Sequence, residues 1–114
     1  MKEKRTDERR QTFEYWATSD TETGKPVGRL VDINRDGLRL HCEQPVPVGT
    51  IFGLTIHLDK KIAGRSTLNV KVRTRWCRKF SSSQLYAAGF GIISPSAQFM
   101  AIEQKLVDYF SVPA

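Results

Sequence analysis

Two short segments of the sequence carry side chains that could hold a flat, anionic ligand. The first lies near the N-terminus, where Arg5 and Arg9 are four residues apart and Arg10 follows. A guanidinium group is always charged, can donate two hydrogen bonds to one phosphate or to the edge of a base, and stacks on flat rings. Arginines at this spacing could therefore recognise a phosphate-bearing ligand. The alternative is a solvated charged tail that Asp7 and Glu8 partly neutralise.

The second segment is the run Asp32-Ile33-Asn34-Arg35-Asp36-Gly37. Asp36 and Gly37 tolerate a positive φ, so the run predicts a tight hairpin turn, which needs no ligand. A turn alone leaves Asp32 and Arg39 unexplained, because both place a charged group beside the same corner. Together with a mobile arginine arm, these two side chains could clamp a dianionic ligand.

Patterns that support catalysis or metal binding are missing from the sequence. It contains no nucleophile elbow, no P-loop and no HExxH motif. Cys42 and Cys77 are far apart and belong to no CxxC or Cys/His cluster, while His41 and His57 fall on the polar phase of strand patterns. We therefore expect no enzymatic activity, no metal site and no cofactor.

Short runs with a period of two predict strands separated by turns. In one of them, this period places Trp76 inward with Leu68 and leaves Lys71, Arg73 and Arg75 as a basic outer row. The expected strands are Thr12 to Thr18, Pro26 to Ile33, Leu38 to Glu43, Ile51 to Leu58, Leu68 to Trp76 and Tyr86 to Ile93, with a turn at Asp20 to Gly24 and a loop at Asp59 to Ser66.

The period changes near the C-terminus. Ser94 is a candidate N-cap with Pro95 at the first helical position, and apolar residues then recur at three- and four-residue spacing, which predicts an amphipathic helix over residues 95–111. Six short strands followed by one helix favour a mainly β fold, a small six-stranded antiparallel β-barrel with one C-terminal α-helix. We expect a flexible arginine-rich arm over residues 1–11 and a single domain over residues 12–114.

The charge balance favours an anionic partner. Eighteen Lys and Arg against twelve Asp and Glu give a net charge of +6 and a pI near 9.6, as expected for a protein that binds a nucleotide, a nucleic acid or an anionic surface. No apolar run approaches the roughly 20 residues that span a bilayer. The charged N-terminus lacks the apolar core of a signal peptide, so we expect a cytoplasmic protein without a membrane span.

The two segments, in this order and in this predicted topology, resemble the PilZ domain family. An RxxxR arm precedes a D/N-x-S-x-x-G turn in that family, VDINRDGLRL resembles its strand-turn-strand, and PVPVGTIFGLTI and YAAGFGIIS resemble its later strands. The resemblance covers nearly the whole chain. It implies a non-enzymatic receptor for the bacterial second messenger cyclic di-GMP.

The resemblance also implies roles for individual residues. Arg5 and Arg9 would contact guanine edges, stack on the bases and neutralise phosphate, and Arg10 could replace Arg9 if the arm shifts by one residue. Asp32 would accept hydrogen bonds from the guanine N1 and N2 donors, and Gly37 would let the chain turn beneath the ligand. Asn34 stands where the family has serine.

Three functions stay open on the sequence alone. The first is a cyclic di-GMP switch whose arm folds onto the barrel and changes the surface shown to a protein partner in motility, pilus or exopolysaccharide control. The second is a degenerate adaptor that binds only protein, which the asparagine at position 34 favours. The third is a barrel for single-stranded nucleic acid, which is disfavoured if Trp76 points inward, and we expect no DNA partner.

Overall fold

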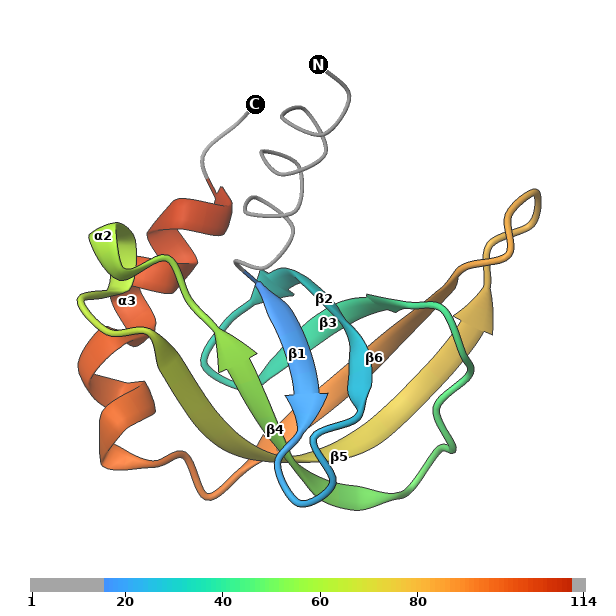
Figure 1. Ribbon diagram of the computed structural model, residues 1–114, viewed down its shortest axis with the longest axis horizontal. Coiled ribbons are helices and arrows are strands. Elements are labelled where there is room, and N and C mark those ends of the chain that lie inside the picture. The colour runs from blue at the N-terminus through green and yellow to red at the C-terminus, as the bar shows by residue number, and fades with distance from the viewer. Residues whose placement is uncertain (1–15, 112–114) are drawn as a thin grey trace.

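Six antiparallel strands close into a barrel in the computed structural model, which describes residues 16–111 (Figure 1). The neighbours around the barrel follow the order β1-β2-β3-β6-β5-β4, so every strand is paired on both sides. This confirms the predicted fold class. The strands are β1 (Ala17–Asp20), β2 (Pro26–Ile33), β3 (Gly37–Cys42), β4 (Ile51–His57), β5 (Thr67–Lys79) and β6 (Tyr86–Ile93), and the helices are α2 (Lys60–Ala63) and α3 (Ala97–Ser111).

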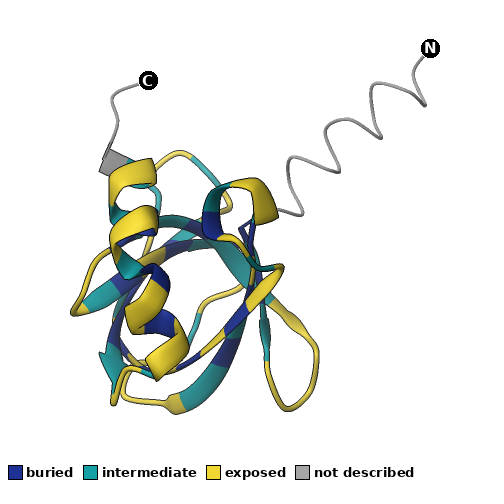
Figure 2. Cartoon of the chain, turned by 90° about the vertical axis from the view of Figure 1, so that its left-hand side faces the viewer, coloured by how far each residue is buried: buried dark blue, intermediate teal, exposed yellow. Residues whose placement is uncertain are grey.

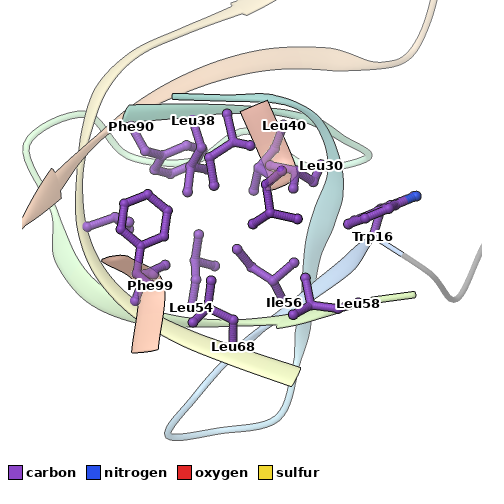
Figure 3. Packing of buried hydrophobic residues seen from close by; sticks show 14 of the residues in the cluster. Trp16, Leu30, Leu38, Leu40, Leu54, Ile56, Leu58, Leu68, Phe90 and Phe99 are labelled. Atoms are coloured by element: carbon purple, nitrogen blue, oxygen red, sulfur yellow. The ribbon is translucent and has the colours of Figure 1, made fainter. Parts of the chain in front are cut away.

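The period-two pattern of the strands becomes the barrel interior. In β3, Leu38, Leu40 and Cys42 are buried while the residues between them are exposed or half-buried. Figure 3 shows such side chains from β3 and β6 facing those from β4 and β5 across the interior. The core consists of Trp16, Leu30, Ile33, Leu38, Leu40, Cys42, Leu54, Ile56, Leu58, Ala63, Leu68, Val70, Val72, Ala88, Phe90, Phe99, Ile102 and Leu106.

α3 lays its apolar stripe against the barrel, with its exposed residues on the opposite face (Figure 2). The helix begins at Ala97, two residues later than predicted, and the Ser96 hydroxyl accepts a hydrogen bond from the Phe99 N–H at 3.0 Å. Ser96 is therefore the N-cap, and the prediction that Ser94 fills this role was wrong. Ser94 has a φ of 48°, which makes it part of the bend that leads the chain from β6 into α3.

The turn after β1 was predicted correctly, whereas the loop after β4 was not. The Asp20 carboxylate accepts hydrogen bonds from the backbone of Glu22 and Thr23 and so closes the turn. Between β4 and β5 the chain forms α2, a single helical turn. The Asp59 side chain accepts from the Lys61 N–H at its start, and Gly64 ends it with a φ of 80°. The predicted first strand overlaps β1 at residues 17 and 18, and its residues 12–15 lie outside the described residues.

β5 is the longest strand, and it carries the irregularity that shapes the site. It pairs with β4 as far as Arg73 and with β6 as far as Lys79, so the β5–β6 hairpin projects beyond the barrel (Figure 1). The register against β6 shifts between Thr74 and Trp76. Thr74 is buried, and the extra residue at position 75 moves Trp76 to the phase of outward-facing Gly89. The prediction of an inward Trp76 was wrong for this reason.

Candidate functional site

The turn between β2 and β3 is built around the side chain of Asn34. Its Oδ1 accepts hydrogen bonds from the backbone N–H groups of Asp36 at 2.9 Å and Gly37 at 3.0 Å. The Asn34 N–H donates to the Gly37 carbonyl at 2.8 Å, which closes the turn. Asparagine commonly holds turns in this way. Asn34 is thus a turn anchor, a role that the sequence analysis did not assign, and its NH₂ group takes no part in these bonds.

Gly37 is required by close approach to β6. A Cβ atom at this position would lie 2.4 Å from the backbone oxygen of Phe90. The glycines with positive φ are Gly24, Gly49 and Gly64, so the expectation that this turn uses positive φ at Gly37 was wrong. Any side chain at position 37 would push the turn away from β6.

Asp32 and Arg39 face each other across β2 and β3 on the outside of the barrel. They are register partners next to a shift between Leu30 and Asp32, and Arg39 Nη2 lies 3.6 Å from Asp32 Oδ2. The Arg39 side chain is 51% exposed and the Asp32 side chain is 50% exposed. An exposed pair of this kind contributes only about 0–1 kcal/mol, so a ligand can displace it at little cost. The structure therefore brings together the two charged groups that the sequence analysis singled out at this corner.

Trp76 and Arg75 join this row from β5. A Cβ atom on Gly89 would lie 2.3 Å from Trp76 Nε1, so the indole covers the bare backbone of β6, and the Arg75 guanidinium covers Gly91 in the same way. The guanidinium carbon of Arg78 lies 4.9 Å from the centre of the Trp76 ring. Arg75 and Trp76 are site residues that the sequence did not predict. The glycines on either side of Phe90 were the available signal, because they indicate close packing on the outer face.

These side chains surround one shallow hollow of about 300 Å³, at the lower end of the range for ligand pockets. It offers a carboxylate for a hydrogen-bond donor edge, guanidinium groups for phosphate, and the Trp76 indole, on which a base could stack by displacing the exposed Arg78 guanidinium that lies over the ring. It is lined by Asp32, Asn34, Asp36, Gly37, Leu38, Arg39, Arg75, Trp76, Gly89 and Phe90.

A second hollow of about 570 Å³ shares no lining residue with the first and is lined in part by Arg29, His41 and Glu43. Arg29 pairs with His41 in the row next to Asp32 and Arg39. The His41 ring packs edge-on against Phe80, at 4.9 Å between ring centres. Burial lowers the pKa of His41 from its usual value, and the nearby charges of Arg39 and Arg29 lower it further. His41 is therefore neutral at pH 7.

A second ion pair lies at the turn between β2 and β3. The Arg35 Nε atom donates to Glu103 Oε2 at 3.1 Å and connects the turn to α3. The remaining predicted site residues, Arg5, Arg9 and Arg10, lie outside the described residues. Within residues 16–111, no group of three or more His, Cys, Asp or Glu side chains could hold a metal ion.

A closed barrel capped by one helix, with a polar hollow at a hairpin corner, defines a small ligand-binding module. The chain belongs to the PilZ domain family, whose family model matches residues 3–110 of its 114 residues. PilZ domains are binding domains rather than enzymes, and the family is known for cyclic di-GMP binding. No curated protein and no solved structure matched the chain. Neither helix in residues 16–111 has the length and apolar character needed to cross a membrane.

Proposed function

We propose that this protein binds cyclic di-GMP at the β2–β3 corner and acts as a ligand-gated switch towards a protein partner. The observation that carries this proposal is the gathering of Asp32, Arg39, Arg75 and Trp76 around one hollow. Stacking, a guanine donor edge and phosphate each find a matching group there. The Arg5 and Arg9 arm, with Arg10 as a possible substitute, would close over the ligand from the other side.

The hollow suits a ligand that is bound partly from outside the barrel. At about 300 Å³ it holds one flat ring with its nearest phosphate more readily than a complete dinucleotide. The arm, and Arg29 and His41 in the next outward row of β2 and β3, would then contact the rest of the ligand. Ordering the arm costs conformational entropy, so the affinity should be modest and closure should follow binding.

Isothermal titration calorimetry with cyclic di-GMP tests the proposal directly. At an ionic strength near 0.1 M, where charges are moderately screened, cyclic di-GMP should bind, while GMP and ATP should compete poorly because they lack two guanines joined by two phosphates. The affinity should fall as salt is raised. An absence of heat at saturating cyclic di-GMP would reject the receptor function, and salt-independent binding would reject the arginine–phosphate contacts.

A second candidate is a degenerate adaptor that binds only protein, in the same motility, pilus or exopolysaccharide pathways. The use of Asn34 Oδ1 inside the turn favours it, because that oxygen is then unavailable to a ligand. The outward orientation of Trp76 favours a third candidate, a barrel that binds single-stranded nucleic acid. The same titration with a single-stranded oligonucleotide separates these candidates, since an adaptor binds neither ligand.

A further inference from the structure

On one exposed part of the barrel, the register partners of two cations, Lys71 and Arg73, are all uncharged. Lys71 has Gly53 and Ile93 as its partners on β4 and β6, and Arg73 has Ile51 and Gly91. Both cations are exposed. No carboxylate of residues 16–111 forms an ion pair with either of them. Their charge is therefore available to a partner.

Exposed apolar side chains lie next to these cations. Ile51 is the register partner of Arg73 and is 44% exposed, and Val48 is 62% exposed. The Gly49 N–H donates to the Thr74 carbonyl at 2.7 Å and the Thr74 N–H donates to the Thr50 carbonyl at 3.0 Å, and these bonds fix the segment after Val48 against β5. We call Val48, Ile51, Lys71 and Arg73 the β4–β5 strip.

The strip is separate from the nucleotide hollow. None of its four residues lines that hollow, although Arg75, the next outward cation after Arg73, does. Lys71 and Arg73 stand two residues apart on one strand, so their Cα atoms are roughly 6–7 Å apart. Carboxylates two residues apart on an extended chain have the same spacing, so a partner strand or loop can match both cations at once.

We propose that the β4–β5 strip docks an extended acidic segment of a partner protein, in which carboxylates flank apolar side chains. Charge complementarity supplies the two ion pairs, and Val48 and Ile51 supply apolar area of the kind that protein interfaces bury at their centre. Phosphate would use the cations but leave these apolar side chains without a partner. The aromatic that could stack on a base, Trp76, lines the nucleotide hollow and not the strip. These observations favour protein over nucleic acid.

Fluorescence anisotropy with a labelled model peptide tests this docking surface. The probe is a short peptide with glutamate at alternate positions and leucine or threonine between them, compared with its glutamine analogue and with an oligothymidylate of equal charge. The full chain should bind the acidic peptide, and the glutamine analogue should bind much more weakly. The oligothymidylate should also bind more weakly than the acidic peptide, since its bases find no aromatic side chain among the four residues of the strip.

A matched pair of double variants separates the strip from net charge. Lys71→Glu with Arg73→Glu should weaken peptide binding by about tenfold or more, because two attractions become repulsions. Lys60→Glu with Lys105→Glu changes the net charge equally on exposed residues of α2 and α3, and should leave the affinity within about twofold, since neither residue belongs to the strip and exposed charges are screened by salt. Ile51→Thr, which retains β-branching, should weaken the peptide and leave the oligothymidylate unchanged.

Three results would overturn the docking surface: equal losses in the two double variants, tighter binding of the oligothymidylate than of the peptide, or no peptide binding at all. Thermal melts of all variants should overlay the parent, because the substituted side chains are exposed. Calorimetry of the Lys71→Glu, Arg73→Glu variant with cyclic di-GMP reports on the other site. If this variant loses peptide binding but still binds cyclic di-GMP, both functions stand. If the parent binds the peptide but not cyclic di-GMP, only the proposed receptor function is rejected.

Discussion

Asn34 stands where the resemblance to the family implies a serine, and its side chain serves the turn. Because Oδ1 accepts two backbone hydrogen bonds, a replacement must still accept them or the corner loosens. Serine can do so through its hydroxyl, although more weakly. Asn34→Ser should therefore retain or improve cyclic di-GMP affinity and change the stability by only tenths of a kcal/mol.

Asn34→Ala is the contrasting variant. It removes the acceptor, so it should lower the free energy of unfolding by roughly 1 kcal/mol and weaken the nucleotide as well. Calorimetry and urea unfolding of both variants check this. If Asn34→Ser bound the nucleotide several-fold more weakly than the parent, the asparagine NH₂ group would itself contact the ligand.

His41 gives the folded protein a dependence on pH. Burial and the charges of Arg39 and Arg29 hold its pKa below the usual 6.5, so the unfolded chain binds more protons in the interval between the two values. The stability contribution is complete above the unfolded pKa and is lost as pH falls through that interval. Thermal melts between about pH 7.5 and pH 5.5 should show this loss. His41→Gln should flatten the profile, and an equal slope in that variant would assign the loss to other groups.

Burial makes the Cys42 thiol unreactive. Burial, and secondarily Cys77, raises the pKa of the Cys42 thiol to about 11. The thiol is then protonated at neutral pH, and the side chain is fully buried in the core. In the native protein, a thiol reagent should modify Cys77, which is only half-buried, well before Cys42. Mass spectrometry after brief alkylation checks the order, and faster modification of Cys42 would show that β3 opens locally.

Among the elements, the β5–β6 pairing determines the candidate site. A Cβ atom on Gly89 would overlap the Trp76 indole, so Gly89→Ala should displace this ring while β6 keeps its backbone pairing. Stacking on a base contributes about 1–3 kcal/mol. The variant should therefore weaken cyclic di-GMP by a comparable amount, and Trp76→Ala should do the same. Retained affinity in both variants, measured by calorimetry, would exclude Trp76 from the binding surface.

The sequence predicted the elements well where one face is buried, and poorly where the pattern depends on a local irregularity. Alternation at Leu38, Leu40 and Cys42 placed β3 correctly, because a strand of a barrel must direct every second residue inward. No such rule reveals the extra residue before Trp76, since a bulge changes pairing without changing composition. The predicted start of α3 was two residues too early because both Ser94 and Ser96 are suitable N-caps.

Two contacts of α3 depend on the whole fold. Arg35 reaches Glu103 across 68 positions of sequence, and Trp16 packs on Tyr109 and Phe110 with ring centres 5.1 and 5.0 Å apart. Neither pair has a local sequence signal. They connect the β2–β3 corner to the middle of α3, and the residue before β1 to the end of the same helix. A ligand that moved the corner, or an arm that pulled on Trp16, would therefore act on the same helix.

At the scale of the molecule, residues 16–111 supply a continuous barrel core, whereas the proposed ligand contacts are divided between the barrel and the arm. Deleting residues 1–11 should leave the thermal melt of the unliganded protein unchanged, because this segment is rich in charged residues and has no large apolar residue after Met1. The same deletion should weaken cyclic di-GMP strongly. Arg5→Ala and Arg9→Ala should each weaken it by roughly 1.5–3 kcal/mol, the range for hydrogen bonds to charged groups.

The comparison of the deletion with these single variants decides how the arm acts. If the arm is a clamp, the nucleotide should raise the melting temperature of the parent by more than that of the deletion variant, since only the parent adds the arm contacts to the bound state. Calorimetric titrations and melts with and without cyclic di-GMP provide both quantities. A deletion that lowered the melting temperature of the unliganded protein would instead make residues 1–11 part of the folded structure. The arginines would then stabilise the barrel rather than close over a ligand.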